Sequence, residues 1–567
     1  MQAELAALSV GSSRIVALLI CSMASPEARC VSLQGRLRSA GSALCKGWAS
    51  RKAQGNGYFP FIPQEAWVTR FSHRVSGYPP ARRMPAHSPG TPMARLLQKT
   101  AASRRRISMD PFDRCQTTHQ DLSPQDLEFR SFAHQRPDLM DRTRQPVFDH
   151  GRDLLTFRLQ PWPTFVGAEK LAELKRLSLG MSNLLKSVPQ RIFASPAERA
   201  SFYNLPSPEI ADIIFSDPNC IAEVIARGDF IDTPQGLKCI EFNFTPNLGG
   251  WETPILADMH LSIPGFSEFV NRNAITVKYT NTIRILFQHL VEDALAKGLG
   301  ADGRLTLGFL LSADDARQPH LGKPLQFFNQ ELKKMLADLG TCVTAEMIFC
   351  PYAELVISRG QVFCRGRRVH SLVDCSDDPL DSRVYRCFKA RTVLFYNGPV
   401  SGPLSDKRNL ALASELESSG LFSDEERQLI RSCLPWSRKV RSEQVEFRGE
   451  RASLPEVLSR YREDMVLKEG TAAGGKGVLM GISTSAAEWE EAVRKALASG
   501  GWMVQERLES RPYLYQSGDS GCAIHDVIWG PFIFGQRYGG VILRMQPACG
   551  RPVNLSLTAT EGIVLEV

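Results

Sequence analysis

Four polar residues, Arg227, Asp229, Glu241 and Asn243, have side chains and a spacing that suit the binding of a metal ion and a phosphate group. The aspartate of Arg227-Gly-Asp229 is followed twelve residues later by Glu241-Phe-Asn243. Apolar runs flank a turn at 232–236, which predicts a strand, a turn and a returning strand that place Asp229 and Glu241 on neighbouring strands. Glu241 and Asn243 are two residues apart, so both side chains leave the same face. These oxygen ligands suit Mg²⁺, and the arginine suits a phosphoryl group in transfer.

A plain hairpin with a polar rim is the alternative interpretation, and a nucleotide pocket elsewhere in the chain would decide against it. The segment 464–478 predicts a strand, the glycine-rich loop Gly474-Gly475-Lys476-Gly477 and a second strand. Glycines let consecutive backbone N–H groups approach phosphate oxygens, and Lys468 would add a point charge. The loop is not a Walker A motif, because Gly477 stands where Ser or Thr is required. A hairpin turn with a solvated lysine is the alternative here.

The segments that follow the loop predict a helix and a strand. Apolar residues recur at helical spacing over 485–499, and Gly500-Gly501 ends that helix. The run 502–508 then reads as a strand that ends in polar residues, among them Gln505 and Glu506. Strand, loop, strand, helix and strand in this order resemble the nucleotide-holding half of an ATP-grasp enzyme.

The motifs together resemble the circularly permuted ATP-grasp family typified by glutathionylspermidine synthase, over about residues 150–567. In ordinary ATP-grasp enzymes the Glu-x-Asn motif follows the glycine-loop lobe, whereas here Glu241-x-Asn243 precedes Lys468 by more than 200 residues. The resemblance implies an α/β fold with α+β lobes and an inserted βαβ domain. It divides the chain into a basic extension (1–108), an arm with the Mg²⁺-binding portion (109–300), an inserted substrate domain (301–400) and the nucleotide lobe (401–567).

The resemblance also implies a role for each motif. Asp229, Glu241 and Asn243 would bind Mg²⁺, as two ions, and Arg227 would stabilise the transferring γ-phosphate. The nucleotide ATP would be held by Lys407, Lys468, the loop Gly474, Gly475, Lys476 and Gly477, and by Gln505 and Glu506 at the adenine. Arg544, near the end of a strand after 529–540, would face an acyl phosphate, with a structural ion pair as the alternative.

The implied activity is that of an ATP-dependent ligase that joins a carboxylate to an amine through an acyl phosphate. The carboxylate would be a small molecule or a peptide. Two departures limit the resemblance: Lys468 is followed by Glu469 rather than proline, and no counterpart of the amidase domain is visible, which puts spermidine in doubt. The alternatives are an ATP-binding scaffold without turnover and an ATP-grasp phosphotransferase.

Composition excludes several other classes. Residues 1–108 hold 16 Lys and Arg against 3 Asp and Glu, a charge of +13, whereas the remainder holds 52 against 57, a charge of −5. A mildly acidic body gives no reason to expect nucleic acid, so a basic-tail binder would rest on the extension alone. The 14 cysteines form no CxxC pair, which argues against zinc and disulfides and fits a cytoplasmic protein. No stretch outside the extension is long enough for a membrane span.

The extension itself has no lasting periodicity. Residues 15–24 resemble a short signal h-region, and a Ser/Arg-rich, acid-poor leader also fits an organellar transit peptide. We expect a disordered tail, or translation that begins at Met93 or Met109. Further along, the pattern predicts helices over 167–187, 274–298 and 324–339, strands over 305–311 and 341–349, a hairpin over 354–364 and a strand over 384–388.

Overall fold

The chain is a mixed α/β protein, and its computed structural model describes residues 110–136, 154–155, 157–316, 318, 321–376, 382–472, 474–518, 521–549, 552–553 and 559–567. The described residues from Pro111 onward belong to one unit. The predictions for residues 1–108 fall outside the described part. Within it, no helix combines the length and the apolar character needed to cross a membrane.

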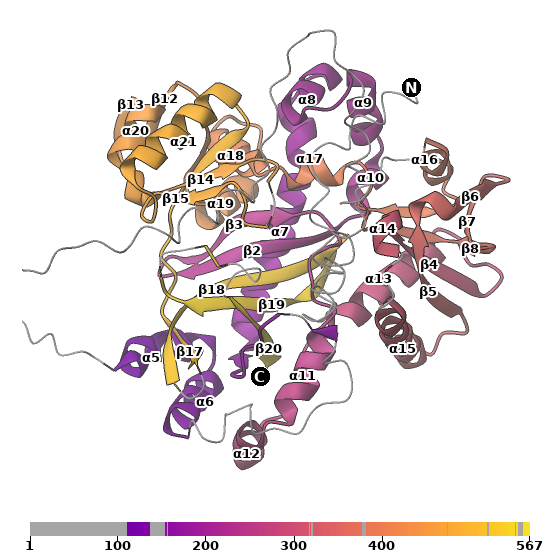
Figure 1. The fold of residues 1–567 in the computed structure, drawn as a ribbon, viewed down its shortest axis with the longest axis horizontal. Helices are drawn as coiled ribbons and strands as arrows, with labels where there is room; N and C mark the ends of the chain where they lie inside the picture. Colours follow the sequence, from indigo (N-terminus) through magenta and orange to yellow (C-terminus); the bar gives the residue numbers. More distant parts are fainter. Residues whose placement is uncertain are drawn as a thin grey trace, which may run out of the picture. The chain divides into compact units, whose positions relative to one another are not determined.

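A seven-stranded sheet forms the centre of this unit (Figure 1). Its strand order is β1 (Thr164–Val166), β20 (Thr560–Glu566), β19 (Arg537–Pro547), β18 (Gly521–Phe534), β2 (Ile225–Thr233) and β3 (Gly236–Asn243), with β17 (Tyr513–Ser517) also on β18. Only the pair of β1 and β20 is parallel. The helix predicted over 167–187 is confirmed as α7 (Ala168–Ile192), whose apolar side packs on one face of the sheet.

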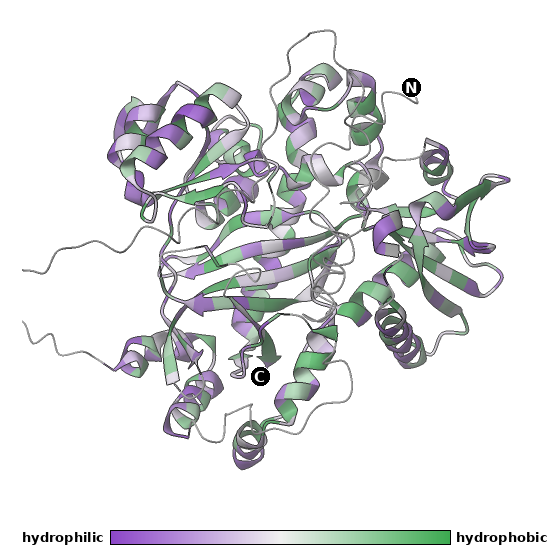
Figure 2. Cartoon of the chain, viewed as in Figure 1, coloured by the Kyte–Doolittle hydropathy of each residue, from purple (hydrophilic) through white to green (hydrophobic). Residues whose placement is uncertain are grey.

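A second sheet is wholly parallel and contains the predicted βαβ unit. Its order is β10 (Leu394–Tyr396), β9 (Ser371–Asp374), β4 (Arg304–Leu311) and β5 (Thr344–Pro351). The crossover helix is α15 (Gly322–Asp338), which confirms the prediction of a strand, a helix and a strand over 305–349. The predicted hairpin is present as β6 (Leu355–Ser358) and β7 (Gln361–Cys364), with β8 (Arg367–Val369) beside it. In Figure 2, α13 (Thr282–Ala296) is mostly apolar where it meets this region, and α15 shows a hydrophilic outer side.

The third sheet is small and has the element order predicted for a nucleotide lobe. Its strands are β11 (Ser437–Lys439), β16 (Trp502–Glu506), β14 (Met465–Glu469) and β15 (Val478–Met480). The predicted helix is α21 (Ala486–Ser499), which begins with a capping box between Ser485 and Glu488 and ends at Gly500 with a positive φ of 66°. The helices α18 (Arg408–Glu415) and α19 (Asp424–Cys433) connect this sheet to β3 and α7.

Two of the predicted elements differ in the structure. The segment predicted as a strand over 384–388 is the helix α16 (Ser382–Lys389), because Val384, Tyr385 and Phe388 lie at helical spacing and are buried together. The helix predicted from 274 begins only at Thr282, where the Asn281 side chain caps it. This helix, α13, runs to Ala296.

The remaining elements connect these sheets. The arm predicted from residue 109 is α5 (Pro111–Leu122) and α6 (Pro124–Gln135), as far as it is described. The others are α8 (Pro196–Tyr203), α9 (Pro208–Ser216), α10 (Pro218–Ala222), α11 (Thr253–Leu261), α12 (Pro264–Arg272), α14 (Ala313–Ala316), α17 (Ser401–Ser405), α20 (Leu454–Arg460), β12 (Gln444–Phe447) and β13 (Glu450–Ser453). The ten cysteines whose side chains the structure describes form no disulfide with one another, and seven of them are buried like small apolar residues.

Candidate active site

A cavity of about 610 Å³ lies between the central sheet and the small sheet. Its volume is within the range of roughly 300–1,000 Å³ that is usual for small-molecule sites. The wall combines residues from the β2–β3 hairpin with residues from the β14–β16 sheet, which are more than 200 positions away in sequence. Ten of the residues predicted from the sequence line it: Arg227, Asp229, Glu241, Asn243, Lys468, Gly474, Gly475, Gln505, Glu506 and Arg544.

The β2–β3 hairpin presents its polar residues to the cavity through a bulge. Arg227 pairs with Asn243 and Asp229 with Glu241, but Phe230 pairs with Cys239, so Ile240 is the extra residue. A bulge of this kind shifts the alternation of side chains along a strand. Cys239 is buried against α7, whereas Ile240 and Glu241 both line the cavity. The prediction that Asp229 and Glu241 lie on neighbouring strands is confirmed, and the bulge puts them on one face.

Asp229 lies between two arginines on the cavity wall. Its Oδ1 accepts from Arg227 Nε at 3.1 Å and lies 2.6 Å from Arg544 Nη2. Burial would raise the pKa of Asp229, but Arg544 and Arg227 hold it below its ordinary value. Arg227 also donates through Nη1 to the carbonyl of Leu248. The aspartate is therefore ionised, and it fixes both arginines in place.

A second pair of carboxyl groups, Glu252 and Glu561, lies beside the two arginines. Both side chains are buried, and Glu561 is the cross-strand neighbour of Arg544. Burial and the nearby Glu252 raise the pKa of Glu561 well above its ordinary value, although Arg227 and Arg544 oppose the shift. Glu252 accepts the backbone N–H of Gly250 at 2.9 Å. A protonated Glu561 carries no charge, so it would not neutralise the positive charge of Arg227 and Arg544 beside the cavity.

Lys468 is buried at the base of the cavity. Its Nζ donates to the carbonyl of the bulge residue Ile240 and to Gln505 Oε1, both at 2.8 Å. Burial lowers the pKa of Lys468 to about 8, and Lys407 adds to the shift while Glu241 opposes it. The small sheet and the hairpin therefore meet through this amine, which titrates close to neutral pH.

Lys407 does not line the cavity but connects its two sides. Its Nζ lies 3.2 Å from Glu241 Oε1 and donates to the carbonyl of Ala472 at the start of the glycine-rich loop. Its backbone N–H donates to Gly470 at 2.9 Å. The side chain is buried. Lys407 is thus placed to couple the position of the loop to that of Glu241.

The glycine-rich loop contributes only part of its predicted set. Gly474 and Gly475 line the cavity with φ of 65° and 75°, whereas Lys476 is exposed and Gly477 is turned away. The carbonyl of Gly477 accepts the N–H of Glu469 at 2.8 Å and so closes the loop. A Cβ at Gly477 would lie 2.8 Å from Glu469. Gly477 therefore has a structural role in closing the loop.

Gln505 and Glu506 line the cavity, but their side chains have partners within the protein. Gln505 accepts from Lys468 and donates to Ser437 Oγ at 3.1 Å. Glu506 Oε1 lies 3.1 Å from Arg448 Nη2. Any contact between Gln505 and a base would have to replace these hydrogen bonds, so its first role here is to orient Lys468.

Several cavity residues were not predicted from the sequence. Arg507 and Arg511 follow Glu506 in a loop whose charge pattern could have drawn attention to them, and His525 and Asp526 lie on β18. Burial lowers the pKa of His525 to about 4, so its imidazole is neutral. Arg114 reaches the cavity from α5, far from every motif in the sequence. Arg438, on β11 of the small sheet, donates to Ser414 Oγ and to the carbonyl of Ser437.

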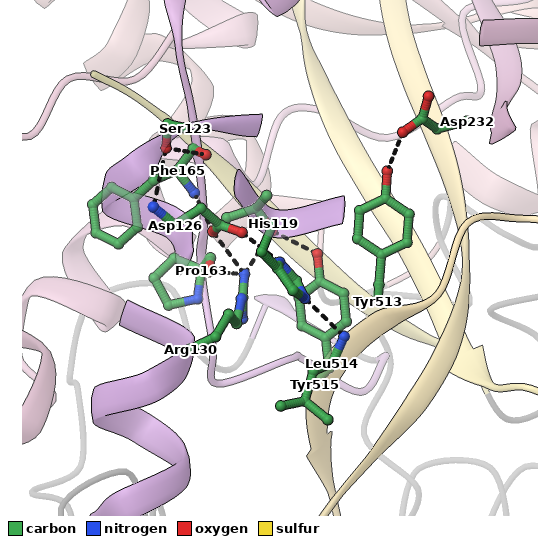
Figure 3. Close-up of polar contacts among 11 residues, drawn as sticks. His119, Ser123, Asp126, Arg130, Pro163, Phe165, Asp232, Tyr513, Leu514 and Tyr515 are labelled. Carbon is green, nitrogen blue, oxygen red and sulfur yellow. Dashed lines mark hydrogen bonds and ion pairs between the residues drawn. The ribbon is translucent and has the colours of Figure 1, made fainter. Parts of the chain in front are cut away.

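The arm that carries Arg114 is held by a polar network around His119 (Figure 3). His119 Nδ1 lies 2.6 Å from Asp126 Oδ2, and its Nε2 accepts the backbone N–H of Leu514 at 2.9 Å. Ser123 lies nearby but donates to the carbonyl of Phe165. Because both imidazole nitrogens are used, His119 cannot activate a nucleophile, and the Ser, His and Asp side chains here hold the fold.

The oxygen donors of the hairpin fit a hard divalent cation in type. Asp229, Glu241 and Asn243 offer two carboxylates and an amide on one cavity wall. In the part of the chain that is described, no three His, Cys, Asp or Glu side chains gather closely enough to hold a metal, so the amide is a necessary member of the set. A cation would share carboxylates that Arg227, Arg544 and Lys407 now neutralise.

Comparisons with known proteins give loose similarities. No family model and no curated protein matches the chain. A glutathione synthetase-like effector from Globodera pallida, solved in its apo form, aligns with 11% identity and a TM-score of 0.45 over 82% of this chain and 99% of its own. A protein assigned as γ-glutamylcysteine synthetase from Methylobacillus flagellatus aligns with 9% identity and a TM-score of 0.30 over 69% and 87%. The function proposed below therefore rests on the cavity.

Proposed function

We propose that the protein is an ATP-dependent carboxylate–amine ligase with a circularly permuted ATP-grasp arrangement. One observation carries the proposal: the carboxylates and Arg227 of the β2–β3 hairpin, together with Arg544 of β19, face the same cavity as Lys468 and the glycine-rich loop. Neither set alone defines a nucleotide site. Together they supply donors for phosphate oxygens, acidic ligands and a fixed pair of arginines.

The proposed reaction has two steps. An oxygen of the substrate carboxylate attacks the γ-phosphorus of ATP, the bond to the β-phosphate oxygen breaks, and ADP leaves. The amine nitrogen then attacks the acyl carbon, the bond between that carbon and the phosphate oxygen breaks, and phosphate leaves as the amine loses a proton. The products are an amide, ADP and phosphate.

The residues act mainly through position and charge. Arg227 and Arg544 are fixed by Asp229, so their positive charge is organised before substrate arrives, which is the condition for electrostatic stabilisation of a transition state. Lys468 and the N–H groups of Gly474 and Gly475 would hold the phosphates, and Lys407 would couple loop and hairpin. Asp229, Glu241 and Asn243 would hold Mg²⁺, which when bound neutralises charge on phosphate oxygens.

The domain division inferred from the sequence belongs to the same proposal. The parallel sheet of β4, β5, β9 and β10 would be the inserted substrate domain. The small sheet of β11, β14, β15 and β16 would hold the nucleotide. The permuted order explains why the hairpin precedes Lys468 along the chain.

ADP release with pooled carboxylates and amines tests the proposal. We expect ADP to form only with ATP, Mg²⁺ and the right acid, and we expect hydroxylamine to trap the activated acid as a hydroxamate. The test variant is Glu241→Gln, which removes one negative charge at nearly constant shape and is expected to abolish turnover. A stable phosphorylated product without hydroxamate would instead show a phosphotransferase.

A nucleotide-binding scaffold without turnover is a second candidate, and one observation favours it. The carboxylates expected to bind Mg²⁺ are already neutralised by arginine and lysine. If ATP binds with the same affinity with and without Mg²⁺, and no acid promotes ADP release, the scaffold is the better description.

A further inference from the structure

An apolar pocket lies on the same face of the central sheet as the polar cavity. Its volume is about 80 Å³, several times the roughly 10–15 Å³ that admits one water molecule. Ile225, Leu248 and Phe532 line it from the central sheet and the loop after β3. Leu311, Phe349 and Cys375 line it from the other side. An apolar pocket of this size excludes water and accepts an apolar group.

Alternation along the strands connects this pocket to the arginines. Ile225, Arg227 and Asp229 occupy alternate positions of β2, so they share one face, with Ile225 in the pocket and the other two in the cavity. On β18, Phe532 is the cross-strand partner of Arg227 and lines the pocket. The sheet face thus changes from apolar to charged at Arg227.

The loop after β3 borders the pocket and also contacts Arg227 of the cavity. Its residue Leu248 lines the pocket, and its carbonyl accepts from Arg227 Nη1. Gly250 closes the loop with φ of 89°, and a Cβ there would lie 2.6 Å from Phe532. Only glycine lets this loop pack so closely, so the pocket and the position of Arg227 are set by one segment.

The opposite wall is the carboxyl edge of the parallel sheet. Leu311 ends β4, Phe349 lies near the end of β5, and Cys375 directly follows β9. Ligands of open parallel sheets bind at this edge. The hydroxyl of Thr282, a pocket residue that is almost completely buried, has no hydrogen-bond partner among the described residues. The side-chain oxygen of Asn247, another pocket residue, is likewise buried without a partner among the described residues, so the pocket is apolar with two unpaired polar atoms on its lining residues.

We propose that this pocket binds the apolar part of the carboxylate substrate, whose acid group lies toward Arg227. The inference rests on the proposed function and gives it a substrate class: acids that carry a compact apolar group, either a branched aliphatic chain or a single ring. Each methylene buried in the pocket is expected to strengthen binding by about fourfold until the pocket is full.

Direct binding to the full-length protein tests this, with 4-methylpentanoate and 3-phenylpropionate compared with the polar diacid glutarate. We expect both apolar acids to bind at least tenfold more tightly than glutarate in calorimetry. Leu321→Trp fills the pocket from a half-buried position and is expected to remove the preference. The matched control is Leu339→Trp, the same substitution at an exposed leucine outside the pocket, which is expected to leave it unchanged.

Phe349→Leu provides a second variant that enlarges the pocket instead of filling it. It is expected to move the optimum toward acids that are one or two methylenes longer. Equal binding of glutarate and the apolar acids, or an unchanged preference in both pocket variants, overturns the inference. Binding of a non-hydrolysable ATP analogue is measured separately: its absence in the wild-type protein counts against the ligase, whereas its presence without the apolar preference counts against the pocket alone.

Discussion

Asp126 and Asp229 are both buried beside arginine, yet their surroundings differ. Asp126 accepts from Arg130, from His119 and from the backbone N–H of Phe165, and the guanidinium of Arg130 lies 4.5 Å over the ring of Tyr515. Asp229 has two arginines, Arg227 and Arg544. Guanidinium nitrogens without a hydrogen-bond partner among the described residues occur in both Arg130 and Arg544, so unpaired donors do not distinguish the two sites. Location does: Asp126 and Arg130 are completely buried, whereas Arg227, Asp229 and Arg544 line the cavity and can meet a ligand.

Arg227→Ala is expected to give the largest effect on turnover. Its charge is organised toward the cavity before any substrate binds, so its removal should lower kcat by about 10³-fold while ATP affinity changes little. Single-turnover kinetics and calorimetry separate the two quantities. The control is Arg448→Ala, an arginine that contacts Glu506 at the surface, which should change kcat by less than threefold. Normal turnover of Arg227→Ala would contradict its role.

The same substitution at the two aspartates sharpens the comparison. Asp126→Asn leaves Arg130 buried without its counter-charge and should lower the free energy of unfolding by about 3–5 kcal/mol. Asp229→Asn should cost only about 1–2 kcal/mol, because its arginines face a cavity that water can enter, but it should abolish turnover. Urea denaturation measures the free energy of unfolding of each variant, and ADP release measures its turnover. Comparable losses of stability would show that both networks serve the fold.

The pH dependence of ATP binding tests the environment of Lys468. The amine has a pKa of about 8 in the free protein, against an ordinary value near 10.5, so it is charged below pH 8 and loses its proton above it. Phosphate binds the charged form, hence affinity should be flat below pH 8 and fall by up to about tenfold per pH unit above it. Calorimetry in buffers of different ionisation enthalpy should show proton uptake at pH 9. Lys468→Arg should remove this dependence.

The smallest effect is expected from removal of the basic extension. A chain that begins at Met109 keeps α5, with Arg114 and His119, and should match the full chain in turnover and solubility. A chain that begins at residue 137 loses the whole His119 network and should fold poorly. Circular dichroism checks the folding of each truncated chain, and ADP release checks its turnover. Loss of folding in the first chain would show that residues 1–108 contribute to the fold.

Patterns in the amino-acid sequence are enough to predict most local elements and the types of residue at the site. Hairpin spacing predicted that Asp229 and Glu241 lie on neighbouring strands, and glycine and helix signals predicted the order of β14, β15, α21 and β16. These are short-range properties, since turn residues and apolar periodicity act within about a dozen positions. The same short range explains why the sequence predicts a strand where α16 lies. A run of five residues is too short to distinguish the helical period of about 3.6 residues from the strand period of about two.

The tertiary structure decided which of these residues meet. The bulge at Ile240 turns Glu241 toward Asp229, and Gln505 accepts a hydrogen bond from Lys468 across the small sheet. Arg114 reaches the cavity only because the His119 network docks α5 on β17. Such contacts join segments hundreds of positions apart, so their geometry depends on how whole sheets pack. Local sequence patterns identify the types of residue that could form a site, whereas the packing of the sheets determines which of these residues lie together.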